Sequence, residues 1–207
     1  MAVPHGIRTL GILGSGICSY LSASSIADHL VGQMGLGIAY VAALRAKVPV
    51  LLSDKSQTQI KSGLALFDKL LAKDTDKGKI TSVEAAEARD RLSVADDVKD
   101  MRDVDMVVEV GPICPPSKST RLTIRPGFKA VSENLSLKSS IFRSLAAELR
   151  PDAILASNTS SISITKIASA VVPEGYSAAS LEGKKSASRV VGASRPSHPS
   201  LALLINR

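Results

Sequence analysis

Three glycines near the N-terminus would have the spacing that holds a phosphate-bearing cofactor if residues 17–32 between them were set aside. Gly14 and Gly16 end an apolar stretch that begins at Thr9, and Gly35 follows in the sequence Gln-Met-Gly. In a G-x-G-x-x-G fingerprint these glycines permit a tight turn, a close approach of the backbone to a pyrophosphate, and close packing of helix on strand. The phosphates bind at the positive N-terminal end of that helix. The glycines therefore predict a dinucleotide-binding turn.

An aspartate completes this pattern. Asp54 closes an apolar stretch, residues 48–52, that is typical of a buried parallel strand, and it lies 19 residues after Gly35. An acidic residue about 20 residues beyond the glycines bonds the adenosine ribose hydroxyls in dinucleotide-binding domains. A carboxylate there would repel the extra phosphate of NADP. We therefore predict NAD as the cofactor.

Two internal segments interrupt the motifs, and a third follows them. Removing residues 17–32 joins the flanks into GILGSGQMGLGIAYVAALRA, a complete fingerprint that enters a helix. Removing residues 110–129 leaves DMVVEAVSENLSLKSSIFRSLAAEL, which reads as a strand, a short loop and a helix. We call residues 17–32, 110–129 and 193–207 the atypical segments. They interrupt or follow one predicted domain, residues 1–192, and we expect the last segment to be disordered.

The atypical segments also differ in composition from the rest of the chain. They hold both cysteines, two of the three histidines, six of the ten prolines, and six basic residues against one acidic residue. Our hypothesis is that they are translated non-coding or out-of-frame sequence. The alternative is a natural exposed loop inserted into an active variant. The two cysteines are isolated from each other and form no metal-binding motif.

The remaining sequence alternates strands and helices. Residues 57–73 and 136–149 have apolar residues at helical spacing, and the second helix is predicted to bury Leu137, Ile141, Leu145 and Leu149. Thr81 and Glu84 form a capping-box pattern at the start of another helix. This alternation predicts an α/β fold, a Rossmann-like parallel sheet with helices on both faces.

A polar cluster follows the predicted buried strand at residues 153–156. The cluster, Ser-Asn-Thr-Ser-Ser, occupies residues 157–161, at the carboxyl end of the strand, where ligands bind in open parallel sheets. The alternative interpretation is a strand-to-helix loop whose Ser and Thr cap the next helix. Nothing nearby supplies the base that a nucleophilic serine needs.

Composition argues against two classes of partner. The net charge of +7 comes mostly from the atypical segments, and only 3% of residues are aromatic, so we expect no nucleic-acid partner. A helix that crosses a bilayer needs about 18 consecutive apolar residues. No apolar stretch of the sequence approaches that length, so we expect no membrane partner. The first residues carry neither a secretory signal nor an Arg-rich transit peptide, and the compartment stays open.

Without the atypical segments, the motifs GSGQMGLGIAYVAA, VVEAVSENLSLK and ILASNTSSISITKIA, together with Asp54, resemble the NAD-binding domain of the L-3-hydroxyacyl-CoA dehydrogenase family. That family includes the 3-hydroxybutyryl-CoA dehydrogenases. The resemblance implies NAD-dependent oxidation of a 3-hydroxyacyl-CoA to a 3-ketoacyl-CoA, in fatty-acid or butanoate metabolism. It also implies a mitochondrial or cytoplasmic location.

The resemblance implies a role for each site residue. Gly14, Gly16 and Gly35 would cradle the NAD pyrophosphate, and Asp54 would hold the adenosine ribose. From the ENLSLK motif, Glu133 and Lys138 would lie near the nicotinamide half of the cofactor. Ser160 matches the family's catalytic serine, which bonds the 3-oxygen of the acyl-CoA substrate.

The sequence departs from the family after Gly192. The family's G-L-H-F-F-N-P motif, whose histidine takes the hydroxyl proton, is replaced by ASRPSHPSLALLINR, and the context of His198 does not match it. The helical domain through which the family homodimerises is also absent from these residues. We therefore expect this chain to be inactive as written. The alternatives are a non-catalytic, truncated dinucleotide-binding domain or another NAD-dependent dehydrogenase of the superfamily, such as a sugar-acid dehydrogenase.

Overall fold

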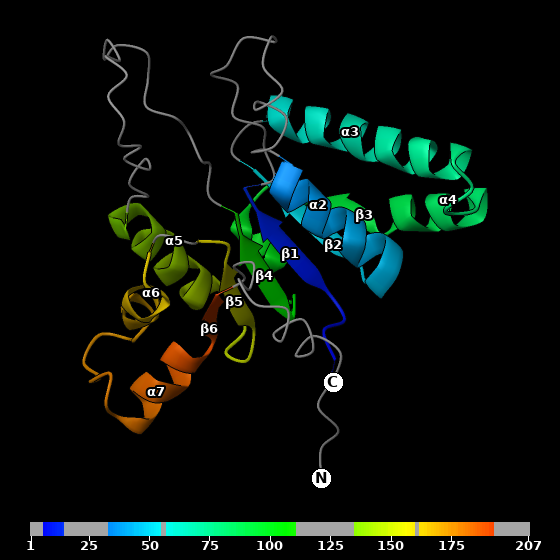
Figure 1. Cartoon of the computed structure of the whole chain (residues 1–207). Coiled ribbons are helices and arrows are strands. Elements are labelled where there is room, and N and C mark those ends of the chain that lie inside the picture. The colour runs from blue at the N-terminus through cyan, green and yellow to red at the C-terminus, as the bar shows by residue number, and fades with distance from the viewer. Residues whose placement is uncertain (1–5, 15–32, 55–56, 111–134, 160–161, 193–207) are drawn as a thin grey trace, which may run out of the picture.

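Six parallel strands form a single sheet at the centre of the molecule. The computed structural model describes residues 6–14, 33–54, 57–110, 135–159 and 162–192. The strands lie in the order β3-β2-β1-β4-β5-β6 (Figure 1), which is the strand order of a doubly wound dinucleotide-binding fold. Their bounds are β1 Leu10–Leu13, β2 Val50–Ser53, β3 Leu92–Val94, β4 Met106–Glu109, β5 Ile154–Ser157 and β6 Val190–Gly192.

The register of the sheet brings the strand ends together. Leu13 of β1 pairs with Ser53 of β2 on one side and with Glu109 of β4 on the other. Glu109 in turn pairs with Ser157 of β5. The residues that follow these strands therefore share one edge of the sheet, which we call the carboxyl edge. The order of the strands reverses direction between β1 and β4, so this edge contains the topological switch point.

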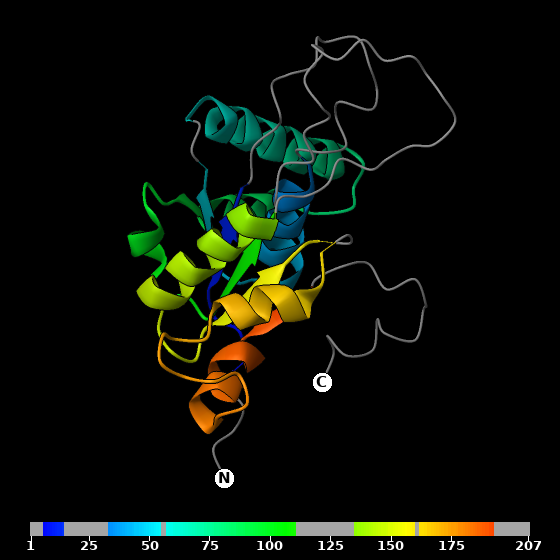
Figure 2. The ribbon, with the colours of Figure 1, turned by 90° about the vertical axis from the view of Figure 1, so that its left-hand side faces the viewer.

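Helices cover both faces of the sheet (Figures 1 and 2). Over β1 and β2 lie α2 (Gln33–Val41), α3 (Gln57–Asp76) and α4 (Ser82–Asp90), and a π-helical turn, Ala42–Ala46, extends α2. Over β4 and β5 lie α5 (Leu135–Glu148) and α6 (Ile164–Ala170). The short α7 (Leu181–Ser188) follows, and a 3₁₀ turn, Val98–Met101, precedes β4. The predicted fold class is confirmed.

Each face of the sheet has its own hydrophobic core, because successive strand residues point to opposite faces. Ile12 packs in the cluster of α2 and α3 that contains Phe67. Val107 and Leu155 pack in the cluster of α5 and α6. Burial on both faces explains why the strands are almost continuously apolar. A polar residue at a strand end is therefore conspicuous.

The prediction for the buried face of α5 is partly wrong. Leu145 and Leu149 are buried as predicted, but Leu137 is 51% exposed. Its neighbour Lys138 is buried instead, together with Phe142. Apolar spacing alone favoured the leucine, because a buried lysine is rare unless it has an oppositely charged partner. The buried face thus follows Lys138, Phe142, Leu145 and Leu149, so the predicted orientation is correct at the end of the helix and wrong in its first turn.

The capping box is confirmed. The Thr81 hydroxyl accepts a hydrogen bond from the Glu84 backbone N–H at 3.2 Å, and the Glu84 carboxylate accepts one from the Thr81 N–H at 2.8 Å. These bonds satisfy N–H groups that have no partner within the helix, and so they fix where α4 begins.

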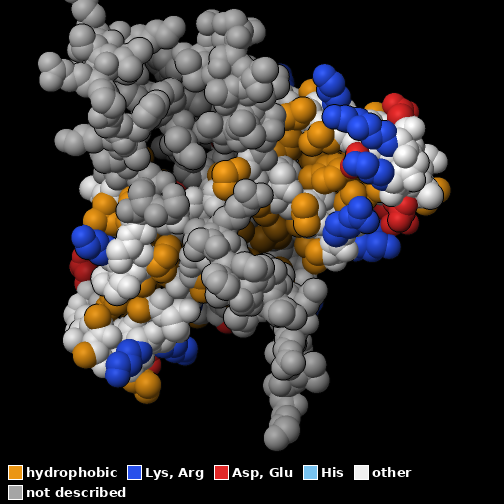
Figure 3. Space-filling model, viewed as in Figure 1, with side chains coloured by type: hydrophobic (Ala, Val, Ile, Leu, Met, Phe, Trp, Pro, Cys, Tyr) orange, Lys and Arg blue, Asp and Glu red, His pale blue; other side chains and the backbone are white. Residues whose placement is uncertain are grey.

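Charged side chains on the face shown in Figure 3 gather over α3 and α4 and near α7, where basic and acidic residues lie side by side. The Arg89 and Asp68 side chains form an ion pair that joins α4 to α3 at 2.7 Å. A screened surface pair of this kind contributes little to stability. Within the described residues, no helix has both the length and the apolar character required to cross a bilayer.

Candidate cofactor-binding site

The turn after β1 requires glycine for two separate reasons. Gly14 has φ 87°, in the left-handed region that side chains disfavour. A Cβ at this position would lie 2.3 Å from the carbonyl oxygen of Val110. The Gly14 N–H donates to the Ser53 carbonyl at 2.9 Å, which fixes the turn against the end of β2. Glycine is therefore required at the first fingerprint position, where β1 ends.

Val110, the first residue of the second atypical segment, belongs to the ordered sheet edge. It is buried, and its N–H donates to the Leu13 carbonyl at 2.9 Å. Its carbonyl oxygen is the atom that leaves no room for a side chain at Gly14. The domain thus accommodates this residue within its core.

Two further predicted residues lie near the same turn. Gly35 is buried in the first turn of α2, as expected for a glycine that lets a helix pack closely on a strand. Asp54 is half-buried and directly follows Ser53, the residue bonded by Gly14. The structure therefore brings the first glycine and the acidic residue to adjacent strand ends. Gly16 lies outside the described residues.

A buried polar cluster occupies the adjoining part of the carboxyl edge. Glu109, Lys138 and Ser157 are each more than nine-tenths buried. The Lys138 ammonium donates to both carboxylate oxygens of Glu109 at 2.8 Å, and the Ser157 hydroxyl donates to Oε2 at 2.8 Å. The carboxylate and ammonium neutralise each other, which is the condition under which charges are tolerated inside a protein.

The end of β5 is tied to this cluster and to the start of α2. The Asn158 N–H donates to the Glu109 carbonyl at 2.9 Å, and the Asn158 side-chain amide lies 3.5 Å from the Met34 sulfur. Thr159 is buried, and its hydroxyl accepts from the Ile162 N–H at 3.2 Å. Ile162 precedes α6, whose N-cap residue Ser163 makes no side-chain cap bond, so the Thr159 bond lies within the loop and does not cap the helix. Ser160 and Glu133 lie outside the described residues.

The residues assigned to the site from the sequence did not include Glu109, and they included Ser157 only as part of the polar cluster at residues 157–161. Both residues have a recognisable signal, because each is a polar residue that ends an otherwise apolar strand, Met106–Glu109 or Ile154–Ser157. Lys138 was assigned to the site from the family motif alone. What could not be read from the sequence is that these three side chains meet.

The opposite, amino edge of the sheet has its own acidic residue, Asp105. It accepts hydrogen bonds from the Arg8 N–H at 2.7 Å and the Thr9 N–H at 2.8 Å, and from the Arg150 side chain. Burial raises the pKa of Asp105, but these bonds and that from the Thr9 hydroxyl outweigh burial and leave the pKa below its ordinary value.

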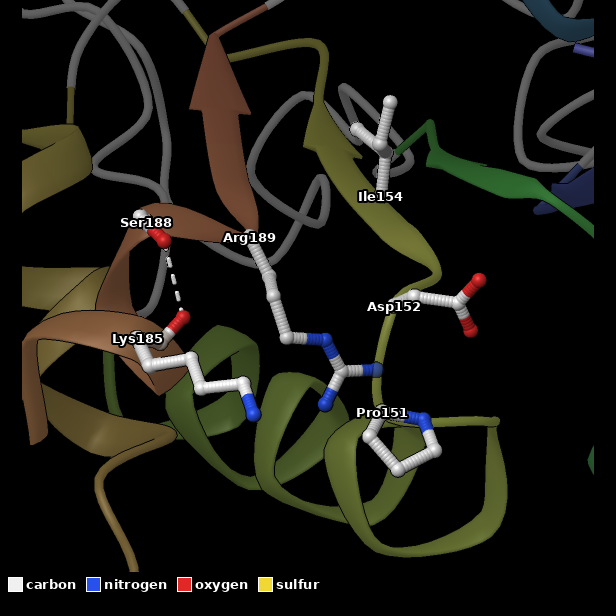
Figure 4. Close-up of a pocket in the computed structure, with 6 residues that line it drawn as sticks. All are labelled: Pro151, Asp152, Ile154, Lys185, Ser188 and Arg189. Atoms are coloured by element: carbon white, nitrogen blue, oxygen red, sulfur yellow. Dashed lines mark hydrogen bonds between the residues drawn. The ribbon is translucent and has the colours of Figure 1, made fainter. Parts of the chain in front are cut away.

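A hollow of about 370 Å³ also opens at this amino edge (Figure 4). Arg189 lies along it and donates to the backbone carbonyls of Ala153 at 3.0 Å and Arg150 at 2.8 Å. Burial lowers the pKa of Arg189. Through these two bonds the Arg189 guanidinium holds the segment that connects α5 to β5. In the described part of the chain, no three His, Cys, Asp or Glu side chains are grouped as metal ligands.

Comparison with known proteins identifies relatives of this fold and sequence. The sequence profile of the 3-hydroxyacyl-CoA dehydrogenase NAD-binding domain matches residues 31–113 and 128–177. The profile omits residues 114–127, which lie within the second atypical segment, and it begins at residue 31, close to the end of the first. The gap in the profile thus falls within the second atypical segment, whereas residues 1–30, which include Gly14 and Gly16 as well as most of the first segment, lie outside the matched range.

Two curated relatives and one solved structure are similar to the chain. A 3-hydroxybutyryl-CoA dehydrogenase of Bradyrhizobium diazoefficiens is 38% identical over 139 residues, which is 67% of this chain and 40% of the relative. The fatty acid oxidation complex subunit alpha of Pseudomonas entomophila is 31% identical over 84% of this chain and 19% of its own length. The crystal structure of (S)-3-hydroxybutyryl-CoA dehydrogenase from Ralstonia eutropha has a TM-score of 0.62 at 27% identity, over 90% of this chain and 48% of that one. The chain therefore spans less than half the length of these relatives.

Proposed function

The chain belongs to the family of 3-hydroxyacyl-CoA dehydrogenase NAD-binding domains, and we propose that its carboxyl edge is the NAD site of such a dehydrogenase. The observation that carries the proposal is the Gly14 turn, whose N–H is bonded to the end of β2 next to Asp54. In this fold type the dinucleotide binds at the switch point between the strands, which here is the edge shared by β1 and β4.

The residues present fit NAD in both shape and charge. At Gly14 the absence of a side chain lets the end of β1 lie close to the residue that follows β4, and the buried Gly35 allows α2 to start close to the sheet. Asp54 would accept hydrogen bonds from the ribose hydroxyls and exclude the extra phosphate of NADP. Lys138 would contribute to the site indirectly, by holding the Glu109 carboxylate to which its ammonium is bonded.

The reaction we propose for the complete site is oxidation of a 3-hydroxyacyl-CoA to a 3-ketoacyl-CoA. NAD supplies the hydride acceptor when it is bound. Ser160 would donate a hydrogen bond to the 3-oxygen of the substrate, and the end of β5 would present it. A base must also take the hydroxyl proton. The 207 residues contain no G-L-H-F-F-N-P motif to supply that base.

The first atypical segment weakens the cofactor site in this proposal. Residues 17–32 separate the second glycine from the third. The added loop costs little stability, about 0.6 kcal/mol per doubling of loop length. Binding is more sensitive, because the phosphates need the N-terminus of α2 at a fixed distance from the turn. We propose that a polypeptide of these 207 residues binds NAD weakly or not at all and does not turn over substrate.

Two assays on the 207-residue chain test this proposal. A fluorescence titration with NADH and NADPH, repeated on Asp54→Asn, should show weak binding that favours NADH, and the variant should lose the preference. Equal affinities for the two cofactors in the unaltered chain would count against the NAD site.

In the second assay, NADH formation from NAD and 3-hydroxybutyryl-CoA should be undetectable, and robust oxidation would overturn the proposed inactivity. Binding without turnover is the result expected of a non-catalytic cofactor domain.

The origin of the atypical segments is tested separately. We propose that they derive from non-coding or out-of-frame sequence. Sequencing the mature transcript across codons 16–33, 109–130 and 192 onward should reveal a dominant message that lacks the two internal segments. A dominant message that retains them would identify the segments as natural insertions.

A further inference from the structure

The Glu109 carboxylate lies where three elements meet, and its bonds have a specific arrangement. It accepts from Lys138 of α5 and from Ser157, the last residue of β5, each at 2.8 Å. The carbonyl of the same residue accepts from the Asn158 N–H at 2.9 Å. One residue therefore binds α5, the end of β5 and the first residue of the loop that follows.

We propose that Glu109 is a positioning residue, which fixes the carboxyl end of β5 at Ser157 and Asn158. The inference rests on the proposed function, because only a site at this edge gives the position of that strand end a consequence for chemistry. Glu109 acts through Ser157 and Asn158, and through Lys138 it also sets the distance of α5 from the strand.

Stability alone is a poor explanation for this cluster. Replacing a buried ion pair with apolar side chains of similar volume is often neutral or stabilising, because desolvation of the charges offsets their attraction. All the surrounding residues in the two strands are apolar, so the fold could have continued its core here. Directed hydrogen bonds differ from apolar contacts because they fix orientation as well as distance. A strand end that must hold a defined geometry gains from them.

The test separates position from stability in the full 207-residue chain. The double variant Glu109→Leu with Lys138→Met replaces the ion pair with apolar side chains. The single variant Ser157→Ala removes only the side-chain bond to β5. Asp105→Asn is the matched control, because it removes a hydrogen-bonded carboxylate from the other end of β4. Thermal unfolding reports global stability. Amide hydrogen exchange of Asn158 and Ile162 reports the order of the strand end.

We expect Asn158 and Ile162 to exchange about tenfold faster in the double variant and in Ser157→Ala, since the lost bonds involve a charged acceptor. The melting temperature of the double variant should stay close to that of the unaltered chain. Asp105→Asn should lower the melting temperature without a selective change at these amides.

Unchanged exchange at Asn158 and Ile162 in a folded double variant would overturn the proposal. If the double variant does not fold, Ser157→Ala decides alone, and unchanged exchange in it has the same meaning. An NADH titration of the chain with residues 17–32 deleted, run alongside, addresses the proposed function. Absence of binding by that chain refutes the cofactor site and leaves the exchange comparison valid, so the two failures are distinguishable.

Discussion

The two ends of β4 carry the same chemistry in different surroundings. Asp105 precedes the strand and Glu109 ends it, and each carboxylate accepts several hydrogen bonds and pairs with a basic side chain of the region around α5. At the amino edge the side chains of Asp105 and Arg150 are 11% and 31% exposed. At the carboxyl edge those of Glu109 and Lys138 are 4% and 7% exposed.

This difference in burial determines which of the two ion pairs, Asp105–Arg150 or Glu109–Lys138, tolerates the loss of one partner. Water can solvate what remains of the amino-edge pair, so a substitution there costs the bonds themselves. At the carboxyl edge the remaining charge would stay more than nine-tenths buried after losing the partner that neutralises it. Substitution of one partner should therefore destabilise the Glu109–Lys138 pair more, and this pair lies at the edge where the cofactor is proposed to bind.

The largest effect should come from breaking the buried pair on one side only. Lys138→Met leaves the Glu109 carboxylate buried without its cation, and we expect a loss of about 3–5 kcal/mol in the free energy of unfolding. Urea denaturation measures it. Adding Glu109→Leu should recover most of the loss, and a double variant as unstable as the single one would show that charge imbalance is not the cause.

Asp105→Asn should cost less, about 1.5–3 kcal/mol at neutral pH. The folded-state pKa of Asp105 is lowered from its ordinary value of 3.8, so its contribution to stability is present above that value and is lost as pH falls through the folded pKa. The stability difference between the two proteins should therefore shrink toward zero in acid. Urea denaturation as a function of pH checks this, and a difference that persists in acid would assign the effect to packing.

Gly14→Ala probes the backbone at the carboxyl edge. The substitution places a Cβ against the Val110 carbonyl at a φ of 87°, and we expect a loss of roughly 1–3 kcal/mol with loss of any NADH binding. Gly78→Ala is a suitable control, since that glycine also has a positive φ but has open space around it. Equal losses in the two variants would mean that the close contact with Val110 is unimportant.

The smallest effect should come from Leu137→Ala, beside Lys138 on α5. Because Leu137 is exposed, the change should stay within about 0.5 kcal/mol. Leu145→Ala, on the buried face of the same helix, should cost about 2–5 kcal/mol. Chemical denaturation of both variants tests the observed orientation of α5, and similar losses would support the orientation predicted from apolar spacing.

Local patterns were sufficient to predict much of the fold. The alternation of apolar strands and helices, the Thr81 capping box and the glycine at the end of β1 each follow from short-range chemistry. The resemblance in the motifs around Asp54 and Lys138 is matched by the family profile.

The predictions failed where a side chain depends on a partner distant in sequence. Lys138 faces inward only because Glu109, 29 residues earlier, supplies its counter-charge. Likewise, Ser157 is an ordinary loop-flanking serine in the sequence, and its role depends on the register between β4 and β5. Helical periodicity carries no information about such pairs, so Leu137 was assigned to the core in place of its neighbour.

The central claim is that the carboxyl edge is an NAD site interrupted by residues 17–32. Its most direct test is a fluorescence titration with NADH of the 207-residue chain and of the same chain with residues 17–32 deleted. We predict that the deletion, which rejoins the strand turn to α2, tightens NADH binding by at least roughly tenfold. Equal affinities in the two proteins, or tighter binding by the chain that retains residues 17–32, would contradict the account.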